Sequence, residues 1–167
     1  MVGLMDKLKL THLDEAGAAR MVDVGGKATT YRRAVAQAFC RMQKKTADTI
    51  RFGNTKKGDV LQIARIAGIG AAKRTDELIP LCHSLPLDTV EVQFDWPEDG
   101  LLRIQVTAAC NGRTGVEMEA LVAASLSALT VYDMCKSVDR SMRVESVELV
   151  EKSGGVHGDF KKDWCQE

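Results

Sequence analysis

A long apolar segment in the last third of the chain places the strongest constraint on its fold. Residues 114–136, TGVEMEALVAASLSALTVYDMCK, carry no ionisable side chain between Glu119 and Asp133 except Tyr132. At helical spacing, one face of this segment holds large side chains and the opposite face holds mostly alanines. A helix that is apolar on all sides is normally buried. We therefore predict a core helix whose alanine face is approached closely by a sheet or a second helix.

The two ends of this helix are charged, and each end has an ordinary structural interpretation. Thr114 followed by Glu117 has the spacing of a helix-capping box. Asp133 and Lys136 are three residues apart, so they share one helix face and would form a surface ion pair by default. Glu117 and Lys136 lie nearly 30 Å apart at a rise of about 1.5 Å per residue. They cannot share one small-molecule site within a subunit, so a role for both ends predicts sites joined by symmetry.

The equal numbers of basic and acidic side chains limit the kinds of molecule that this protein is expected to bind. The 167 residues include 23 basic and 23 acidic side chains, which argues against general binding to nucleic acid or to membrane surfaces. The apolar segment is shorter than the roughly 18 apolar residues of a membrane span. Five scattered cysteines without a CxxC pair indicate reduced thiols, and we expect a cytoplasmic protein. We expect one domain at residues 19–161, between a flexible arm at 1–18 and a tail at 162–167.

The periodicity of the rest of the chain predicts an α+β fold. Two alternating runs are joined by the turn sequence PEDG and predict a β-hairpin. The order of elements matches a ferredoxin-like antiparallel sheet with helices on one face, extended by an N-terminal strand and helix. The predicted elements outside the apolar helix are strand 20–24, helix 30–42, helix 59–79, strands 89–96 and 102–108, and strand 142–150.

Lysines and carboxylates at helix ends are the candidates for chemistry, because nucleotide-binding loops and metal-ligand clusters are absent from the sequence. Lys57 precedes a helix start, where it would bind phosphate or lie solvated in a loop. His83 lies in an apolar loop, as a packing residue or a ligand-binding one. Lys73 belongs to a charged helix surface. Asp133 and Lys136 form either a surface pair or an acid–base pair, whose lysine pKa partial burial would lower.

Four longer motifs resemble the cyclic pyranopterin monophosphate synthase family of molybdenum cofactor biosynthesis. They are KGDVLQIARIAGIGAAKRT, DELIPLCH, TGVEMEAL and ALTVYDMCK, and the shorter MVDV, KSGG and GDF are similar to the same family. The resemblance runs from about residue 10 to residue 161. It implies a lyase that converts 3',8-cyclo-7,8-dihydro-GTP into cyclic pyranopterin monophosphate with release of pyrophosphate. It also implies a homohexamer, a trimer of dimers, with active sites at subunit interfaces.

The resemblance assigns roles to particular residues of the domain. Asp133, Lys136 and Lys57 become catalytic candidates for acid–base chemistry without a metal or a resident cofactor, while Mg²⁺ on the triphosphate stays open. Arg32, Arg65 and Lys73 are plausible partners for the triphosphate. Substrate-pocket residues implied by the resemblance are Leu81, Cys82, His83, Met118, Glu119 and Lys73, with Glu117 beside them.

Three positions depart from the family pattern, and some alternatives stay open. Ser84 stands where proline is usual, Arg113 where lysine is common, and Val156 where the tail often has another lysine. The sequence does not decide which lysine is the acid, or whether ring opening precedes closure of the cyclic phosphate. A non-catalytic module that binds a nucleotide or a pterin, and a purely structural oligomer, are the alternatives from other classes.

Overall fold

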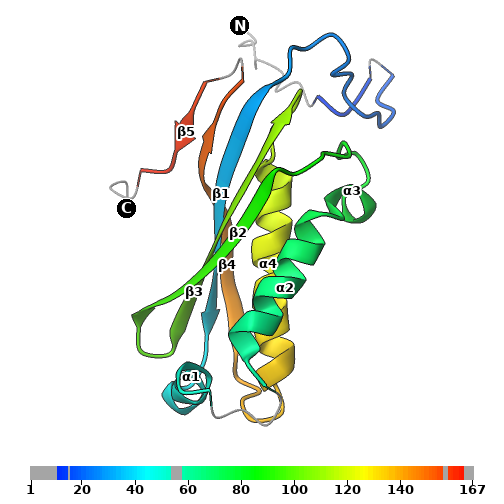
Figure 1. Ribbon diagram of the computed structural model, residues 1–167. Helices are drawn as coiled ribbons and strands as arrows, with labels where there is room; N and C mark the ends of the chain where they lie inside the picture. Colours follow the sequence, from blue (N-terminus) through cyan, green and yellow to red (C-terminus); the bar gives the residue numbers. More distant parts are fainter. Residues whose placement is uncertain (1–10, 15, 54–57, 156–157, 164–167) are drawn as a thin grey trace, which may run out of the picture.

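A five-stranded antiparallel sheet covered on one face by helices forms the fold (Figure 1). The structure, a computed structural model, describes residues 11–14, 16–53, 58–155 and 158–163. The strand order is β2-β3-β1-β4-β5. The ferredoxin-like α+β fold predicted from the sequence is thereby confirmed. The elements are β1 (Thr30–Arg41), α1 (Lys44–Arg51), α2 (Val60–Ala72), α3 (Thr75–Leu78), β2 (Thr89–Glu98), β3 (Leu101–Gly112), α4 (Glu117–Cys135), β4 (Arg143–Ser153) and β5 (Phe160–Lys161).

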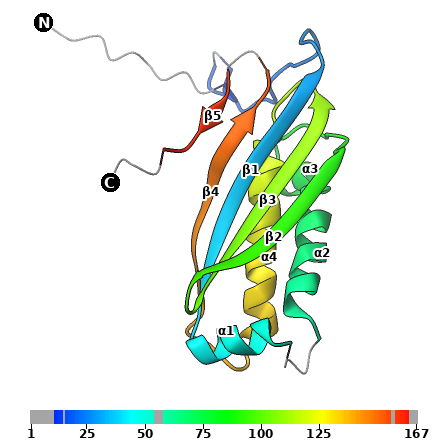
Figure 2. The same cartoon turned by 60° about the vertical axis from the view of Figure 1, so that its left-hand side comes forward.

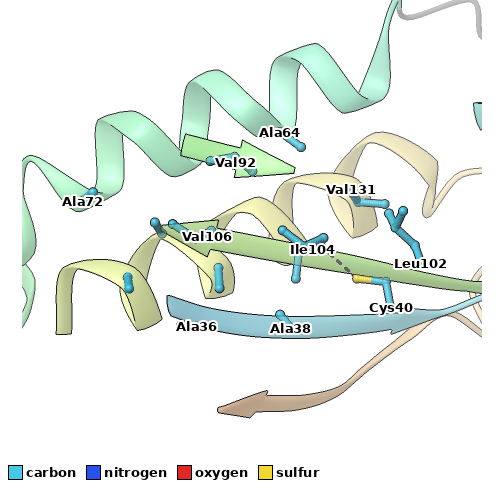
Figure 3. Packing of buried hydrophobic residues seen from close by; sticks show 14 of the residues in the cluster. Ala36, Ala38, Cys40, Ala64, Ala72, Val92, Leu102, Ile104, Val106 and Val131 are labelled. Atoms are coloured by element: carbon cyan, nitrogen blue, oxygen red, sulfur yellow. Dashed lines mark hydrogen bonds between the residues drawn. The ribbon is translucent and has the colours of Figure 1, made fainter. Parts of the chain in front are cut away.

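The core lies between the inner face of the sheet and the two long helices, α2 and α4 (Figures 1 and 2). Figure 3 shows small side chains of β1 beside branched side chains of β3, in one cluster with Ala64 and Ala72 of α2 and Val131 of α4. Cys40 belongs to this layer, where its Sγ lies 3.6 Å from the carbonyl oxygen of Ala128. Burial raises the pKa of Cys40 to about 12, so this thiol stays protonated and unreactive at neutral pH.

The predicted helix at 30–42 is wrong, because this segment is β1, which lies between β3 and β4 in the sheet. From Ala34 to Cys40, every second residue of β1 is small and fully buried on the helix-facing side: Ala34, Ala36, Ala38 and Cys40. The alternation of small and larger residues has the strand period of two. Pairing on both edges and burial under α4 override the helix preference of the alanines.

Residues 20–24, predicted as a strand, belong to no strand of the sheet. Their backbone contacts the loop that contains His83, because the carbonyl oxygen of Val22 lies 2.7 Å from Nε2 of His83. The chain before them turns back on itself, with an isolated bridge between Leu13 and Ala19. This N-terminal hairpin, residues 12–14 and 16–20, was expected to be part of a loose arm. The division of the chain into arm, domain and tail stays a prediction.

Helix α4 is buried along its alanine face and only partly buried along its face of large side chains. Ala120, Ala124 and Ala128 are fully buried against the sheet and α2. Leu129, on the opposite face, is 52% exposed, so the expectation of burial on all sides fails within one chain. By length and composition α4 would qualify as a membrane span, but half of it packs inside this fold. The predicted capping box is also wrong, because Val116 is the N-cap residue and no side chain caps the helix.

One helix that the sequence pattern did not reveal, α1, is anchored by a buried carboxylate. Asp139 is 1% exposed and lies in the turn after α4. Its oxygens accept hydrogen bonds from the backbone N–H of Gln43 at 2.8 Å and from Oγ1 of Thr46 at 3.1 Å. They also accept from the backbone N–H and the Oγ of Ser141 at 3.0 and 2.6 Å. Asp139 therefore joins the start of α1 to the loop between α4 and β4.

Two glycines of α2 give a matched test of how closely α2 and α4 pack. A Cβ at Gly68 would lie 2.2 Å from Oγ of Ser127 and 3.0 Å from the carbonyl oxygen of Ala123, whereas a Cβ at Gly70 would meet nothing within 4 Å. We expect Gly68→Ala to lower the free energy of unfolding by about 1–3 kcal/mol through overpacking. Gly70→Ala should raise it by roughly 0.5–1 kcal/mol, because alanine favours the helix.

Urea denaturation of both variants, followed by far-UV circular dichroism, measures this difference. Equal stabilities of the two variants would contradict the close contact between Gly68 and α4.

Candidate active site

A cationic cavity of about 440 Å³ lies where β1, β4 and the loop before α4 meet. It is lined by Lys27, Arg32, Arg33, Arg113 and Lys152, and by the carboxylate of one glutamate. Backbone of the glycine-containing loops at residues 26, 115, 154 and 158 forms much of the remaining wall. Five cations against one anion, beside accessible backbone, suit a ligand that carries several phosphate charges.

Arg32 has a free donor buried at this cavity. Its Nη1 donates to the carbonyl oxygen of Gly154 at 3.2 Å. Among the described residues, its Nε is a buried side-chain polar atom without a hydrogen-bond partner. Gly155 packs so closely on the guanidinium that a Cβ there would lie 1.6 Å from Nη1. An unsatisfied buried donor is costly, so the arrangement favours an anionic acceptor at this point.

A second cavity, of about 380 Å³, adjoins the first and has a different lining. Leu81, Cys82 and His83 form one side, and Met118 and Glu119 at the start of α4 form another. The two cavities share Lys27, Thr114, Gly115 and Glu117, so they are neighbouring cavities with a common wall, the two ends of one candidate site. The second end combines apolar side chains with carboxylates and an imidazole. Such a lining suits a flat polar heterocycle.

Glu117 separates the two ends of this candidate site. Its Oε1 accepts a hydrogen bond from Nζ of Lys152 on β4 at 3.0 Å. The sequence pattern assigned this glutamate to a capping box, but its carboxylate pairs across the cavity instead. The pair fixes the ammonium group of Lys152 at the edge of the cationic end.

Glu119 is the buried carboxylate of the second cavity, with a side chain 4% exposed. Burial raises its pKa to about 7; its own backbone N–H opposes the rise, and the negative charges of Glu117 and Asp76 add to it. At neutral pH the carboxyl group is therefore present in both protonation states. It can donate a hydrogen bond in one state and accept one in the other.

The raised pKa of Glu119 predicts a pH-dependent effect on stability. The folded chain holds this proton up to about pH 7, whereas the unfolded chain loses it near pH 4.5. The free energy of unfolding therefore falls between these two pH values, by an amount on the order of 3 kcal/mol. We expect Glu119→Gln to be stabilised relative to the wild type at pH 8, and much less so at pH 4.5.

Denaturant unfolding at several pH values checks this prediction, with Glu77→Gln as an exposed control on α3. A stability difference between Glu119→Gln and wild type that does not change with pH would refute the raised pKa.

The other charged end of α4 lies far from these cavities. Nζ of Lys136 donates to Oδ1 of Asp133 at 2.5 Å, and both side chains are more than half exposed. The hydrogen bond to Asp133 raises the pKa of Lys136, whereas the sequence hypothesis expected burial to lower it. Seventeen residues of helix place Lys136 about 25 Å from Glu119. Within one chain, Asp133 and Lys136 therefore lie at the end of α4 opposite to the residues that line the cavities (α4 in Figure 1).

Comparison with known proteins identifies the family. The model of the MoaC family matches residues 21–155. The chain belongs to the MoaC family. It is 60% identical over 153 residues to the cyclic pyranopterin monophosphate synthase of Herpetosiphon aurantiacus, with 91% of this chain and 93% of that protein covered. The enzyme of the same name from Novosphingobium aromaticivorans is 57% identical over 152 residues, covering 91% and 96%.

Membership of the MoaC family confirms two expectations from the sequence. The resemblance carried by the longer motifs is correct, and the chain is an enzyme, a lyase of molybdenum cofactor biosynthesis. A non-catalytic module and a purely structural oligomer are thereby set aside.

The structure brings one part of the predicted MoaC-family site together and leaves other parts elsewhere. Glu117 lies at the junction of the two cavities and Arg32 lines the cationic one, while Leu81, Cys82, His83, Met118 and Glu119 line the second. Lys73 is exposed at the end of α2 and lines neither cavity. Lys57 and Val156 lie outside the described residues.

Arg65, predicted to approach the triphosphate, contacts the edge strand of the sheet. Its Nη1 donates to the carbonyl oxygen of Val92 at 2.5 Å, and its guanidinium lies 5.2 Å from the ring centre of Phe94. These contacts hold α2 against β2. Arg65 lines neither cavity, so within one chain it has a structural contact and no position near the cationic end.

Sequence reasoning missed Lys27, Arg33 and Lys152 in the cationic cavity. Lys152 had a usable signal, because it begins the KSGG motif. The other two are unremarkable in sequence and are placed by the path of the chain into β1. Of the departures from the family pattern, Arg113 still supplies a cation to this cavity. Ser84 donates a hydrogen bond to Asp76 and so ties its loop to α3.

Proposed function

We propose that this enzyme converts 3',8-cyclo-7,8-dihydro-GTP into cyclic pyranopterin monophosphate and releases pyrophosphate. One observation carries the proposal: a cationic cavity and a carboxylate-lined cavity lie side by side and share a wall. A substrate with a triphosphate at one end and a fused heterocycle at the other fits this division. The names of the two relatives, cyclic pyranopterin monophosphate synthases, support the product of this reaction.

In this proposal the cationic end holds the triphosphate. A hydroxyl of the substrate attacks the α-phosphorus, and the bond to pyrophosphate breaks. Negative charge builds on the phosphate oxygens, and Arg32 and Lys152 would stabilise it together with Arg113. Mg²⁺ enters this proposal only as a counter-ion of the substrate's triphosphate, and no resident cofactor is part of it. The second end holds the heterocycle between Glu119 and His83.

The acid–base groups of the proposed reaction are Lys136, oriented by Asp133, and Lys57. Ring opening and ring closure both move protons on nitrogen and oxygen, which lysine ammonium and amine groups can do. Either lysine can act as the acid in this scheme, and the order of the two ring steps is left open. In the single chain Lys136 is exposed and its pKa is raised. A neighbouring subunit that covers it would lower that pKa toward the pH of the cell.

The separation of the two groups along α4 supports a site built from two subunits. Glu119 and Lys136 of one chain are about 25 Å apart, too far to contact one substrate. Exposed apolar side chains on the helix layer, Ile66 at 70% and Leu129 at 52%, offer surface for association. We therefore propose a homohexamer, a trimer of dimers, with interfacial active sites, in the cytoplasm and without nucleic-acid or membrane partners.

Incubation of the purified enzyme with the cyclised GTP derivative tests the proposal. We expect one equivalent of pyrophosphate for each molecule of pterin product, measured by a coupled phosphate assay and by chromatography of the oxidised product. GTP itself, which lacks the extra ring, serves as the control substrate and should give neither. Absence of both products from the cyclised substrate would refute the proposed reaction.

A further inference from the structure

The N-terminal hairpin, residues 12–14 and 16–20, is ordered by its own hydrogen bonds. The backbone N–H of Arg20 donates to the carbonyl oxygen of His12 at 2.9 Å. Oδ1 of Asp14 accepts from the backbone N–H groups of Ala16 and Ala18 at 2.9 and 2.8 Å. Gly17 supplies the positive φ of 83° that the turn requires. The hairpin therefore has a defined shape, although its side chains are mostly exposed.

The chain that follows the hairpin is fastened to the second cavity. A carbonyl oxygen can only accept, so the 2.7 Å contact between Val22 and Nε2 of His83 places a proton on that nitrogen. In its neutral form the His83 ring then offers only Nδ1, as an acceptor. His83 thus holds the N-terminal chain against the cavity as well as lining it.

The fastened chain forms one wall of the second cavity. Thr11, His12, Val22 and Val24 line it, together with Leu81, Cys82, Met118 and Glu119. The imidazole of His12 is exposed and has no hydrogen-bond partner among the described residues. The cavity therefore contains a second imidazole, which is free to bind while the first is held by a backbone carbonyl.

We propose that the N-terminal hairpin is a wall of the heterocycle-binding cavity and that the imidazole of His12 contacts the heterocycle of the substrate. This inference rests on the proposed function. Fused pyrimidine rings present amide and amine groups at their edge, which can donate and accept hydrogen bonds. His12 would supply one such partner in addition to Glu119. Thr11 and His12 then belong to the binding site rather than to a loose arm.

Steady-state kinetics of full-length variants with the cyclised GTP derivative test this inference. We expect His12→Ala to raise KM about tenfold, the effect of losing one hydrogen bond to a substrate, with kcat changed much less. His12→Gln retains an N–H donor and should recover part of the loss. Asp14→Ala, which removes the acceptor that shapes the hairpin, should also raise KM.

Leu13→Ala is the matched control, because Leu13 is on the same hairpin, is 41% exposed and lines neither cavity. Its KM should stay at the wild-type value. A KM of His12→Ala within twofold of wild type, measured on an enzyme that turns over, would overturn this inference alone. A wild-type enzyme that forms no product would overturn the proposed function and this inference with it.

Discussion

Replacement of Lys136 by alanine should reduce kcat by about 10²–10⁴-fold, the usual contribution of one general acid or base. The Lys136 side chain is exposed and its visible contact is the hydrogen bond to Asp133. Removing it should leave the unfolding curve and the oligomeric state of the protein unchanged. Turnover of the cyclised GTP derivative at saturating concentration measures the effect, because saturation separates chemistry from binding.

Two further variants sharpen the test of Lys136. Lys45→Ala removes another exposed lysine, on α1, and should leave kcat unchanged. Asp133→Asn should reduce kcat less than Lys136→Ala does, because it removes only the group that orients the ammonium. The double variant Asp133→Asn/Lys136→Ala should be no slower than Lys136→Ala alone, since Asp133 acts through the lysine. Undiminished turnover of Lys136→Ala would rule out its catalytic role.

Replacement of Asp139 by alanine should lower the free energy of unfolding by about 3–5 kcal/mol. The buried carboxylate accepts hydrogen bonds from Gln43, Thr46 and Ser141, and alanine removes the acceptor that these donors share. Chemical denaturation monitored by circular dichroism measures the loss. Asp139→Asn keeps one acceptor oxygen, so it should lose less stability. This variant can therefore be measured even where Asp139→Ala fails to fold.

The pH dependence of stability gives a second reading for Asp139. Burial opposes ionisation, but the hydrogen bonds outweigh it and hold the pKa of Asp139 below its ordinary value. Its contribution is therefore present above about pH 4 and is lost as the pH falls through the lowered pKa. This acid-dependent loss should be absent from Asp139→Asn. Asp48→Ala, at a partly exposed aspartate of α1, should change stability by less than about 0.5 kcal/mol. Equal stabilities of Asp139→Ala and Asp48→Ala would contradict the anchoring role.

The sequence was most informative where periodicity and burial agreed. The hairpin of β2 and β3 alternates cleanly, and its strands and turn appear close to where the pattern placed them. In β1 the alanines favour a helix by propensity. The segment is a strand because it pairs with β3 on one side and β4 on the other. The small helix α1 depends on the Asp139 carboxylate, 96 residues from Gln43. Contacts at such a distance leave no trace in local periodicity.

The candidate site was also predictable from the sequence only in part. Motifs pointed to the His83 loop and to the start of α4, and the structure brings both into one cavity. The cationic cavity was not foreseen as a unit, because Lys27, Arg33 and Lys152 come from distant parts of the chain. Arg65 had the right charge, but Phe94 and a backbone carbonyl hold it elsewhere. Charge can be read from a sequence, whereas the direction of a long side chain depends on its neighbours.

Helix α4 carries Glu119 of the second cavity near its start and Lys136 directly after its end. Its length therefore fixes the distance between these two groups in the assembly. Each residue of an α-helix adds about 1.5 Å and about 100° of rotation. One inserted residue between Glu119 and Lys136 would therefore turn one group by more than a quarter of a circle relative to the other. In an assembly where the two ends of α4 belong to different sites, the length of α4 sets both the distance between neighbouring active sites and their relative orientation. Insertions and deletions should accordingly be confined to the loops.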